Sequence, residues 1–176
     1  MGLLDRAAKT ASRARYAAGQ GIRSAWYAAQ MQAARSRSGG FDRPGEPEFR
    51  PSRGRPDLSE LRKAYFRLFL QDRANVEAGL YPPPQDLRPA DLPKALKSAQ
   101  AFLRDADEVN RRRLARDGTE VRSQVPEGTN RYPPYYLQNF HYQSGGWFTE
   151  ESAELYDTQV EALFSGTADA MRLAAL

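Results

Sequence analysis

The sequence predicts a mainly α-helical protein: a small domain of about three to four helices, preceded by a basic helical arm and a Pro/Gly-rich linker. Two observations carry this prediction. Apolar residues recur at helical spacing in several stretches of the chain. Residues typical of helix ends, such as Asp, Thr and Gly, stand at the borders of those stretches. Only the segment from Thr119 to Gly128 favours a short β-hairpin.

Residues 1–37 are predicted to form the basic, Ala- and Arg-rich arm. The first 40 residues carry seven Arg or Lys and one Asp, a net charge of +6, whereas the rest of the chain sums to −2. The apolar residues over 3–34 fall on one broad side of the helix, and the Arg residues, Arg23 among them, lie mostly off it. Gly19-Gln20-Gly21 is the expected weak point. The predicted apolar side consists of Leu4, Ala8, Ala11, Ala18, Ile22, Ala25, Trp26 and Ala29.

Three roles for this arm remain open. Its Arg residues, with Tyr16, Trp26 and Tyr27, fit a contact of residues 3–34 with an anionic membrane surface, although an Ala-rich apolar side anchors weakly. An acid-poor segment with Arg and Ser also resembles an organelle transit peptide. A solvated helix, or one that docks on a partner, is the third alternative.

Residues 38–56 are predicted to be a flexible linker. They include four Pro and four Gly among nineteen positions. Such a segment cannot sustain a helix or a strand. It is the clearest boundary in the chain, and it separates the arm from a helical domain at residues 57–176.

The first helix of this domain is predicted to begin after Asp57 and to end near Gly79. Asp57 and Glu60 have the spacing of a capping box. Gly79 is a typical C′ residue, and Pro82 to Pro84 follow soon after it. The expected inward stripe is Leu58, Leu61, Tyr65, Leu68, Phe69 and Val76.

A second helix is predicted from Asp91 to about Gly118, with Pro93 in its first turn. Arg111 to Arg113 fall in its last turns, where cations interact favourably with the helix dipole. The expected inward residues are Leu92, Leu96, Ala99, Phe102, Leu103, Ala106 and Val109.

A third helix is predicted after Thr149, with Glu150 and Glu151 in its first turn. Ser165-Gly166-Thr167 breaks this helix, and Thr167 is expected to cap a fourth one. Because the fourth helix runs into the end of the sequence, we expect that it docks on the body or that the protein once continued. The inward stripe of the third helix is predicted as Ala153, Tyr156, Val160, Leu163 and Phe164.

Composition excludes several classes of site. The chain has no Cys and one His, which rules out disulfides, zinc–thiolate sites, multi-His metal sites and a Cys nucleophile. No run approaches the roughly 20 apolar residues of a membrane span, and the mean hydropathy is −0.74. The pI near 9.5 would suit nucleic acid, but the net positive charge belongs to the arm, the body is net negative and no recognised module is present, so nucleic-acid binding is disfavoured.

Residues 131–148 are the candidate site. They hold seven of the chain's nineteen aromatic residues and its only His. Tyr and Trp suit places where a core meets a ligand or a partner. Alternative roles are packing on the helices for the rings, a structural hydrogen bond for His141, and a cap or turn for Asn139. The candidate substrate or partner face is Tyr132, Tyr135, Tyr136, Asn139, His141, Tyr142 and Trp147.

Several strings after Asp72 are similar to one known family. They are NVEAGLY at 75–81, RYP at 131–133, YLQNFHYQ at 136–143, GW at 146–147 and most of residues 152–172. Together they resemble the N-terminal region of bacterial class I S-adenosylmethionine-dependent methyltransferases. The resemblance implies a helical region that precedes a doubly wound α/β domain, whose Gly-rich turn holds the cofactor. This sequence has no such turn after an apolar strand, so we expect no cofactor to bind the chain alone.

Two hypotheses follow. In the first, the chain is the substrate-side or lid region of a methyltransferase, truncated or split, inactive alone and partnered by the missing catalytic domain. In the second, it is a non-enzymatic accessory subunit that binds a larger complex, membrane-associated or not, through the arm and the aromatic face. Both place the protein in the cytoplasm, with the periphery of the inner membrane as a further location.

Overall fold

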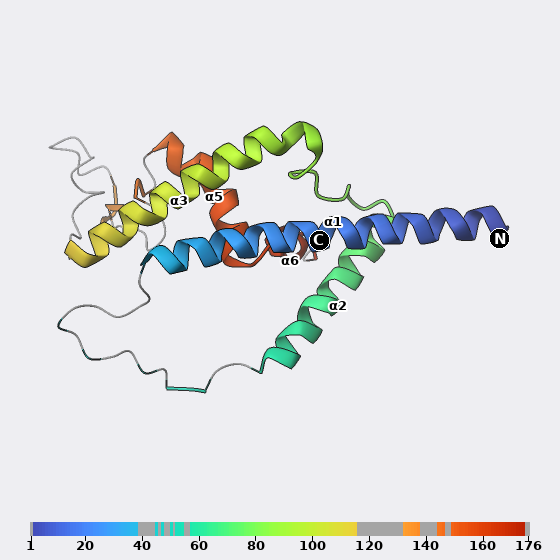
Figure 1. The fold of residues 1–176 in the computed structure, drawn as a ribbon, viewed down its shortest axis with the longest axis horizontal. Helices are drawn as coiled ribbons and strands as arrows, with labels where there is room; N and C mark the ends of the chain where they lie inside the picture. The colour runs from blue at the N-terminus through green and yellow to red at the C-terminus, as the bar shows by residue number, and fades with distance from the viewer. Residues whose placement is uncertain are drawn as a thin grey trace. The chain divides into compact units, whose positions relative to one another are not determined.

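The computed structural model confirms the mainly α-helical fold (Figure 1). It describes residues 2–38, 45, 47, 50, 52–54, 57–115, 132–137, 144–146 and 149–174. No residue in these ranges belongs to a β-strand. The hairpin expected at 119–128 and the helix end expected at Gly118 lie outside them. The helical elements are α1 (Leu3–Ser38), α2 (Leu58–Glu77), the 3-10 helix η1 (Pro89–Asp91), α3 (Leu92–Ala115), the 3-10 helix η2 (Pro134–Leu137), α5 (Glu150–Leu163) and α6 (Ala168–Leu173).

The chain divides into two compact units. The first contains the larger part of α1, all of α2 and all of α6. The second contains the last turns of α1, nearly all of α3 and most of α5. The first unit is Met1–Ala29, Pro51–Leu92 and Glu161–Leu176, and the second is Gln30–Arg50 and Pro93–Val160.

Both ends of α2 form as the sequence predicts. The Asp57 carboxylate accepts a hydrogen bond from the backbone N–H of Ser59 at 2.8 Å. At the other end Gly79 has a φ of +75°, and the N–H of Leu80 donates to the carbonyl of Asn75 at 3.1 Å. This is the Schellman arrangement that a C′ glycine permits.

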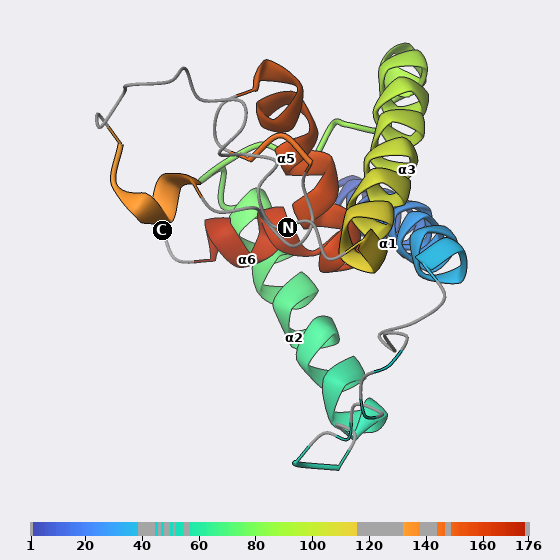
Figure 2. The same cartoon turned by 90° about the vertical axis from the view of Figure 1, so that its left-hand side faces the viewer.

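In the first unit, the only buried residue of α2 is Asp72. The stretch from Leu58 to Leu70 has no buried residue, and Phe66 is 66% exposed. The predicted inward positions of Leu58 and Leu61 are therefore wrong, since both are exposed. α6 packs beside α2 (Figure 2).

α1 is continuous through the expected weak point at Gly19-Gln20-Gly21. Its predicted apolar side is wrong, because Leu4, Ile22 and all five of the predicted Ala residues are exposed. The buried side is mostly polar, and its members recur at spacings of three and four residues. They are Gln20, Arg23, Tyr27, Gln30 and Ala34.

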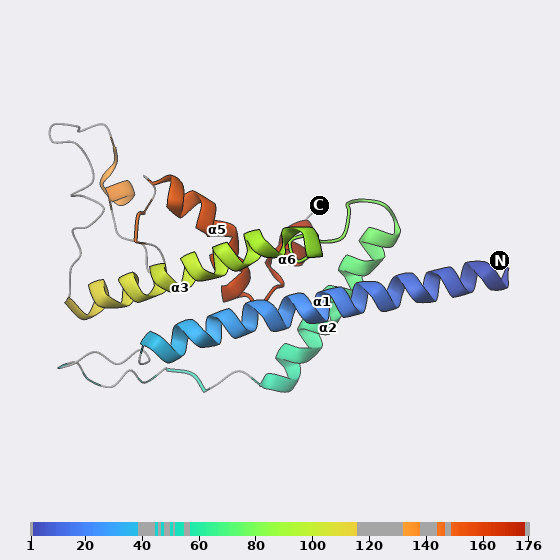
Figure 3. The same cartoon turned by 45° about the horizontal axis from the view of Figure 1, so that its top comes forward.

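In the second unit, the last turns of α1 lie beside α3 (Figure 3). Arg37 forms an ion pair with Asp107 at 3.3 Å, and Arg113 donates to the carbonyl of Ser38 at 3.0 Å. Phe102 is buried, as its place in the predicted stripe requires. Leu92 and Leu96, from the same predicted stripe, are exposed.

The start of α5 is also fixed within the second unit. Thr149 caps the helix, since its hydroxyl accepts a hydrogen bond from the N–H of Ser152 at 3.2 Å, which confirms the prediction. Asp105 of α3 accepts hydrogen bonds from Ser144 and from Gln159, the latter at 2.9 Å.

The predicted inward stripe of α5 is wrong for most of its members. The apolar residues of α5 recur on a side of the helix that is exposed in the structure. The exposed residues are Ala153, Tyr156, Leu163 and Phe164. The buried residues of α5 are Ser152, Gln159, Glu161 and Ala162.

Candidate functional site

The aromatic face predicted at 131–148 is described only in part. Tyr135 and Tyr136 lie in η2 with their ring centroids 4.4 Å apart, and Tyr132 precedes them. Tyr132 and Tyr135 are exposed. A hydrogen bond with Tyr136 raises the pKa of Tyr135. The other predicted residues, Asn139, His141, Tyr142 and Trp147, lie outside the described residues.

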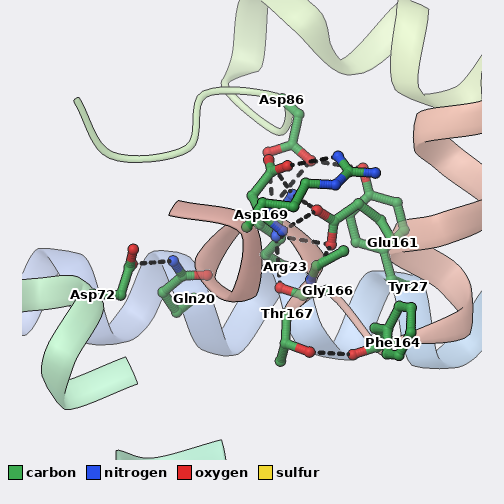
Figure 4. A network of polar contacts seen from close by, with 12 residues as sticks. Gln20, Arg23, Tyr27, Asp72, Asp86, Glu161, Phe164, Gly166, Thr167 and Asp169 are labelled. Carbon is green, nitrogen blue, oxygen red and sulfur yellow. Dashed lines mark hydrogen bonds and ion pairs between the residues drawn. The ribbon is translucent and has the colours of Figure 1, made fainter. Parts of the chain in front are cut away.

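The largest polar network of the described residues surrounds Arg23 of α1 and lies wholly in the first unit (Figure 4). Arg23 Nε donates to the Asp86 carboxylate at 3.0 Å, and Nη2 lies 2.8 Å from the Glu161 carboxylate and 3.0 Å from Asp169. Nη1 donates to Glu161 at 3.1 Å and to the carbonyl of Gly166 at 2.6 Å. All three nitrogens of one guanidinium are thus engaged by three carboxylates and a backbone oxygen.

Glu161 connects Arg23 to the start of α6. Besides the guanidinium, its carboxylate accepts the backbone N–H of Ala168 at 3.2 Å and of Asp169 at 2.9 Å. These are N–H groups that the first turn of a helix leaves unpaired. Thr167 stands at the N-cap position of α6, as predicted, but its side chain makes no capping hydrogen bond. Its hydroxyl donates to the carbonyl of Phe164 at 2.7 Å.

The turn between α5 and α6 is shaped by two residues with positive φ. Ser165 has a φ of +54° and Gly166 a φ of +78°, and the N–H of Gly166 donates to the Glu161 carbonyl at 2.8 Å. Gly166 also lies directly on the α1 backbone. A Cβ at Gly166 would stand 3.0 Å from the carbonyl oxygen of Arg23 and 3.0 Å from Cα of Ser24. Glycine is required here by both the conformation and the close approach.

The electrostatics of this network keep Arg23 charged. Burial by itself lowers the pKa of Arg23, but the hydrogen bond and charge of Glu161, with those of Asp86, outweigh it and raise that pKa. Burial raises the pKa of Glu161, and Arg23 opposes that rise. Tyr27 donates to Asp86 at 2.6 Å, and the Arg23 guanidinium lies 5.3 Å from the Tyr27 ring centroid. Burial, followed by this hydrogen bond, raises the pKa of Tyr27.

A second buried group in the first unit is the carboxylate of Asp72 on α2. It accepts hydrogen bonds from the hydroxyls of Tyr16 and Tyr81, the latter at 2.9 Å, and from the amide of Gln20 at 3.3 Å. Asp72 is only 1% exposed. Burial and the bond to Asp72 raise the pKa of Tyr16. This network attaches α2 to α1 in the way that the Arg23 network attaches α1 to the α5–α6 turn.

The first unit also contains an apolar groove of about 420 Å³ between α2 and the α5–α6 segment. We call it the α2–α6 groove. It is lined by Leu61, Ala64, Tyr65, Leu68, Phe164 and Met171. The Leu61, Phe164 and Met171 side chains are exposed. Its chemistry suits the binding of apolar side chains.

The described residues include no cluster of three or more His, Asp or Glu arranged to hold a metal ion. Within the same ranges, no helix has the length and apolar character needed to cross a membrane. Comparisons with protein-family models, with curated protein sequences and with solved structures find no match for this chain.

Sequence reasoning missed the residues that organise the first unit, above all Arg23, Glu161 and Asp72. The signal that could have identified Arg23 was charge. An arm of net charge +6 precedes a body of net charge −2, so a basic residue of the arm had carboxylates available as partners.

Proposed function

We propose that the chain is the helical, substrate-side region of a protein that resembles S-adenosylmethionine-dependent methyltransferases, inactive alone and completed by a separate cofactor-binding domain. The observation that supports this most is the uncovered apolar surface of the first unit. Leu61, Phe164 and Met171 are exposed around the α2–α6 groove, while Arg23 and Asp72 are buried. Contiguous apolar surface of this kind marks an interaction site.

The resemblance suggests which kind of partner completes the protein. It covers NVEAGLY at the end of α2 and nearly all of α5 and α6. In the family, such a region precedes a cofactor-binding α/β domain. We therefore infer that S-adenosylmethionine, the methyl donor, is held by the partner and that this chain supplies binding surface.

The buried networks are consistent with a scaffold that carries no chemistry itself. Arg23 is saturated by acceptors, and Asp72 is shielded from solvent. A catalytic acid or base must reach a substrate proton. Neither side chain is placed to do so.

A non-enzymatic accessory subunit is the second candidate, and the arm provides an observation in its favour. Tyr16 and Tyr27 suggested a membrane contact, yet both donate hydrogen bonds to carboxylates of the protein itself, Asp72 and Asp86. This use of the aromatic residues favours a helix that docks on protein. An accessory subunit would use the same exposed groove to bind a protein that is not a methyltransferase.

Calorimetric titration of S-adenosylmethionine into the purified chain tests the first proposal. We expect no binding to the chain alone. The DNA after codon 176 is then read for a frame that encodes an apolar strand followed by a Gly-rich turn. Its product, co-expressed with this chain, should bind the cofactor and form a complex. Binding by the isolated chain contradicts the proposal, and clean intergenic sequence favours the accessory subunit.

A further inference from the structure

The α2–α6 groove has a regular apolar floor on one side. Leu61, Tyr65 and Leu68 follow one another at spacings of four and three residues, so they share one face of α2. Phe164 and Met171 line the opposite side. A volume of about 420 Å³ lies in the range of sites that bind small apolar groups. An apolar groove along a helix is the usual acceptor for the apolar face of another helix.

Two cations flank this face of α2. At 3.6 residues per turn, Arg62 lies roughly 95° to one side of the line through Leu61, Tyr65 and Leu68, and Arg67 lies roughly 125° to the other side. Both are exposed, and neither forms an ion pair with any residue that the structure describes. Lys63, on the face away from the groove, is paired with Glu60 at 2.6 Å.

The charges select among the occupants that an apolar groove could accept. A second copy of this chain packed α2 against α2 would bring Arg62 and Arg67 near the same cations, which is unfavourable. A lipid surface accepts an amphipathic helix through one convex face, whereas this site is a concave channel between two elements. A partner helix with an apolar face and acidic residues beside it would pack on the apolar floor and pair with the two cations.

We propose that the α2–α6 groove binds an amphipathic helix of a partner protein, with apolar residues at positions i, i+3, i+4 and i+7 and acidic residues on both sides of that stripe. This inference adds the class of partner to the proposed function. It rests on the proposed function only because both require a partner chain. Met171 and Leu68 contact the apolar stripe, and Arg62 and Arg67 pair with the acidic residues on its two sides.

The test uses the whole chain and two labelled probe peptides. The acidic probe is a designed helical peptide with Leu at i, i+3, i+4 and i+7 and Glu beside this stripe. The basic probe has Lys in place of every Glu. Fluorescence anisotropy should show the acidic probe binding at least about tenfold more tightly than the basic one. This preference should shrink as salt is added.

Variants assign the binding to the groove. Met171→Glu should weaken binding of the acidic probe at least about tenfold. Leu4→Glu, at a position on α1 that is 84% exposed, should leave that binding unchanged. The double variant Arg62→Glu/Arg67→Glu should reverse the preference between the two probes. Arg6→Glu/Arg15→Glu, a double charge reversal on α1, is its matched control. Circular dichroism confirms that each variant remains helical.

Several outcomes overturn the inference. They are equal binding of the two probes, no binding of either probe, and binding of the acidic probe that Met171→Glu does not weaken. A dimer in sedimentation, or binding to phosphatidylserine vesicles, that Met171→Glu abolishes would assign the groove to a second copy or to lipid. If the probes fail while the chain still forms a cofactor-binding complex, only the groove assignment is lost. If the probes bind and no such complex exists, only the methyltransferase proposal is lost.

Discussion

Arg23 and Glu161, which are 138 residues apart in the sequence, meet at 2.8 Å with both side chains only 4% exposed. The same carboxylate caps the start of α6, and the same guanidinium binds the carbonyl of Gly166. One buried ion pair therefore joins a helix near the start of the chain to a turn near its end. Its loss should affect the whole first unit.

Replacing Arg23 with Met should lower the free energy of unfolding by about 3–5 kcal/mol, because the buried carboxylate of Glu161 would lose its cation. Chemical denaturation followed by circular dichroism measures this change. Arg15→Met, at an exposed position of the same helix, is the control and should shift stability by less than about 0.5 kcal/mol. Equal effects of the two substitutions would contradict the role of the network.

Three glycine-to-alanine variants separate conformation from close approach. Gly79→Ala should cost about 1–2 kcal/mol, since φ is +75° but the surrounding space is open. Gly166→Ala should cost clearly more, because its Cβ would also press on the α1 backbone at Arg23 and Ser24. Gly19→Ala, inside α1 with nothing nearby, should stabilise by up to about 1 kcal/mol. If Gly166→Ala costs no more than Gly79→Ala, α1 does not lie against this turn.

Stability should fall in alkali. The folded chain raises the pKa of Tyr16 and Tyr27 above their ordinary value of 10.0. Between that value and the higher folded pKa, the unfolded chain releases the phenolic protons while the folded chain keeps them. The stabilisation of the folded state by these two phenols is thus complete below about pH 10. It is lost as pH rises, at up to about 1.4 kcal/mol per pH unit for each group.

Urea denaturation at a series of pH values, with tyrosinate absorbance as a second probe, measures this loss. The Tyr16→Phe/Tyr27→Phe variant is the control and should show a shallower decline above about pH 10. The same slope in both proteins would mean that these two phenols do not titrate differently in the folded and unfolded states.

The ends of the helices could be predicted from the sequence because their signals are local. Asp57 and Thr149 act on N–H groups two or three residues away, and Gly79 needs only its own positive φ. Each signal lies within one turn of the helix end that it determines. No long-range contact is needed to interpret it.

The buried faces of α1 and α5 could not be predicted in the same way. Apolar periodicity assumes that the inward side is apolar, and it selected exposed residues such as Ile22 and Tyr156. The actual inward residues, such as Arg23 and Tyr27, are polar and find their acceptors 59 to 146 residues away. Such pairs carry no local signature. Most of the aromatic face at 131–148 lies outside the described residues, so its role stays a prediction.

A double-mutant cycle between Arg23→Met and Glu161→Gln tests most directly the claim that a buried ion pair joins α1 to the α5–α6 turn. The free energy of unfolding is measured by urea denaturation for the wild type, both single variants and the double variant. We predict a coupling energy of about 2–3 kcal/mol, since the two groups are in direct contact and buried. A coupling below about 0.5 kcal/mol, the value expected for independent sites, would contradict the claim.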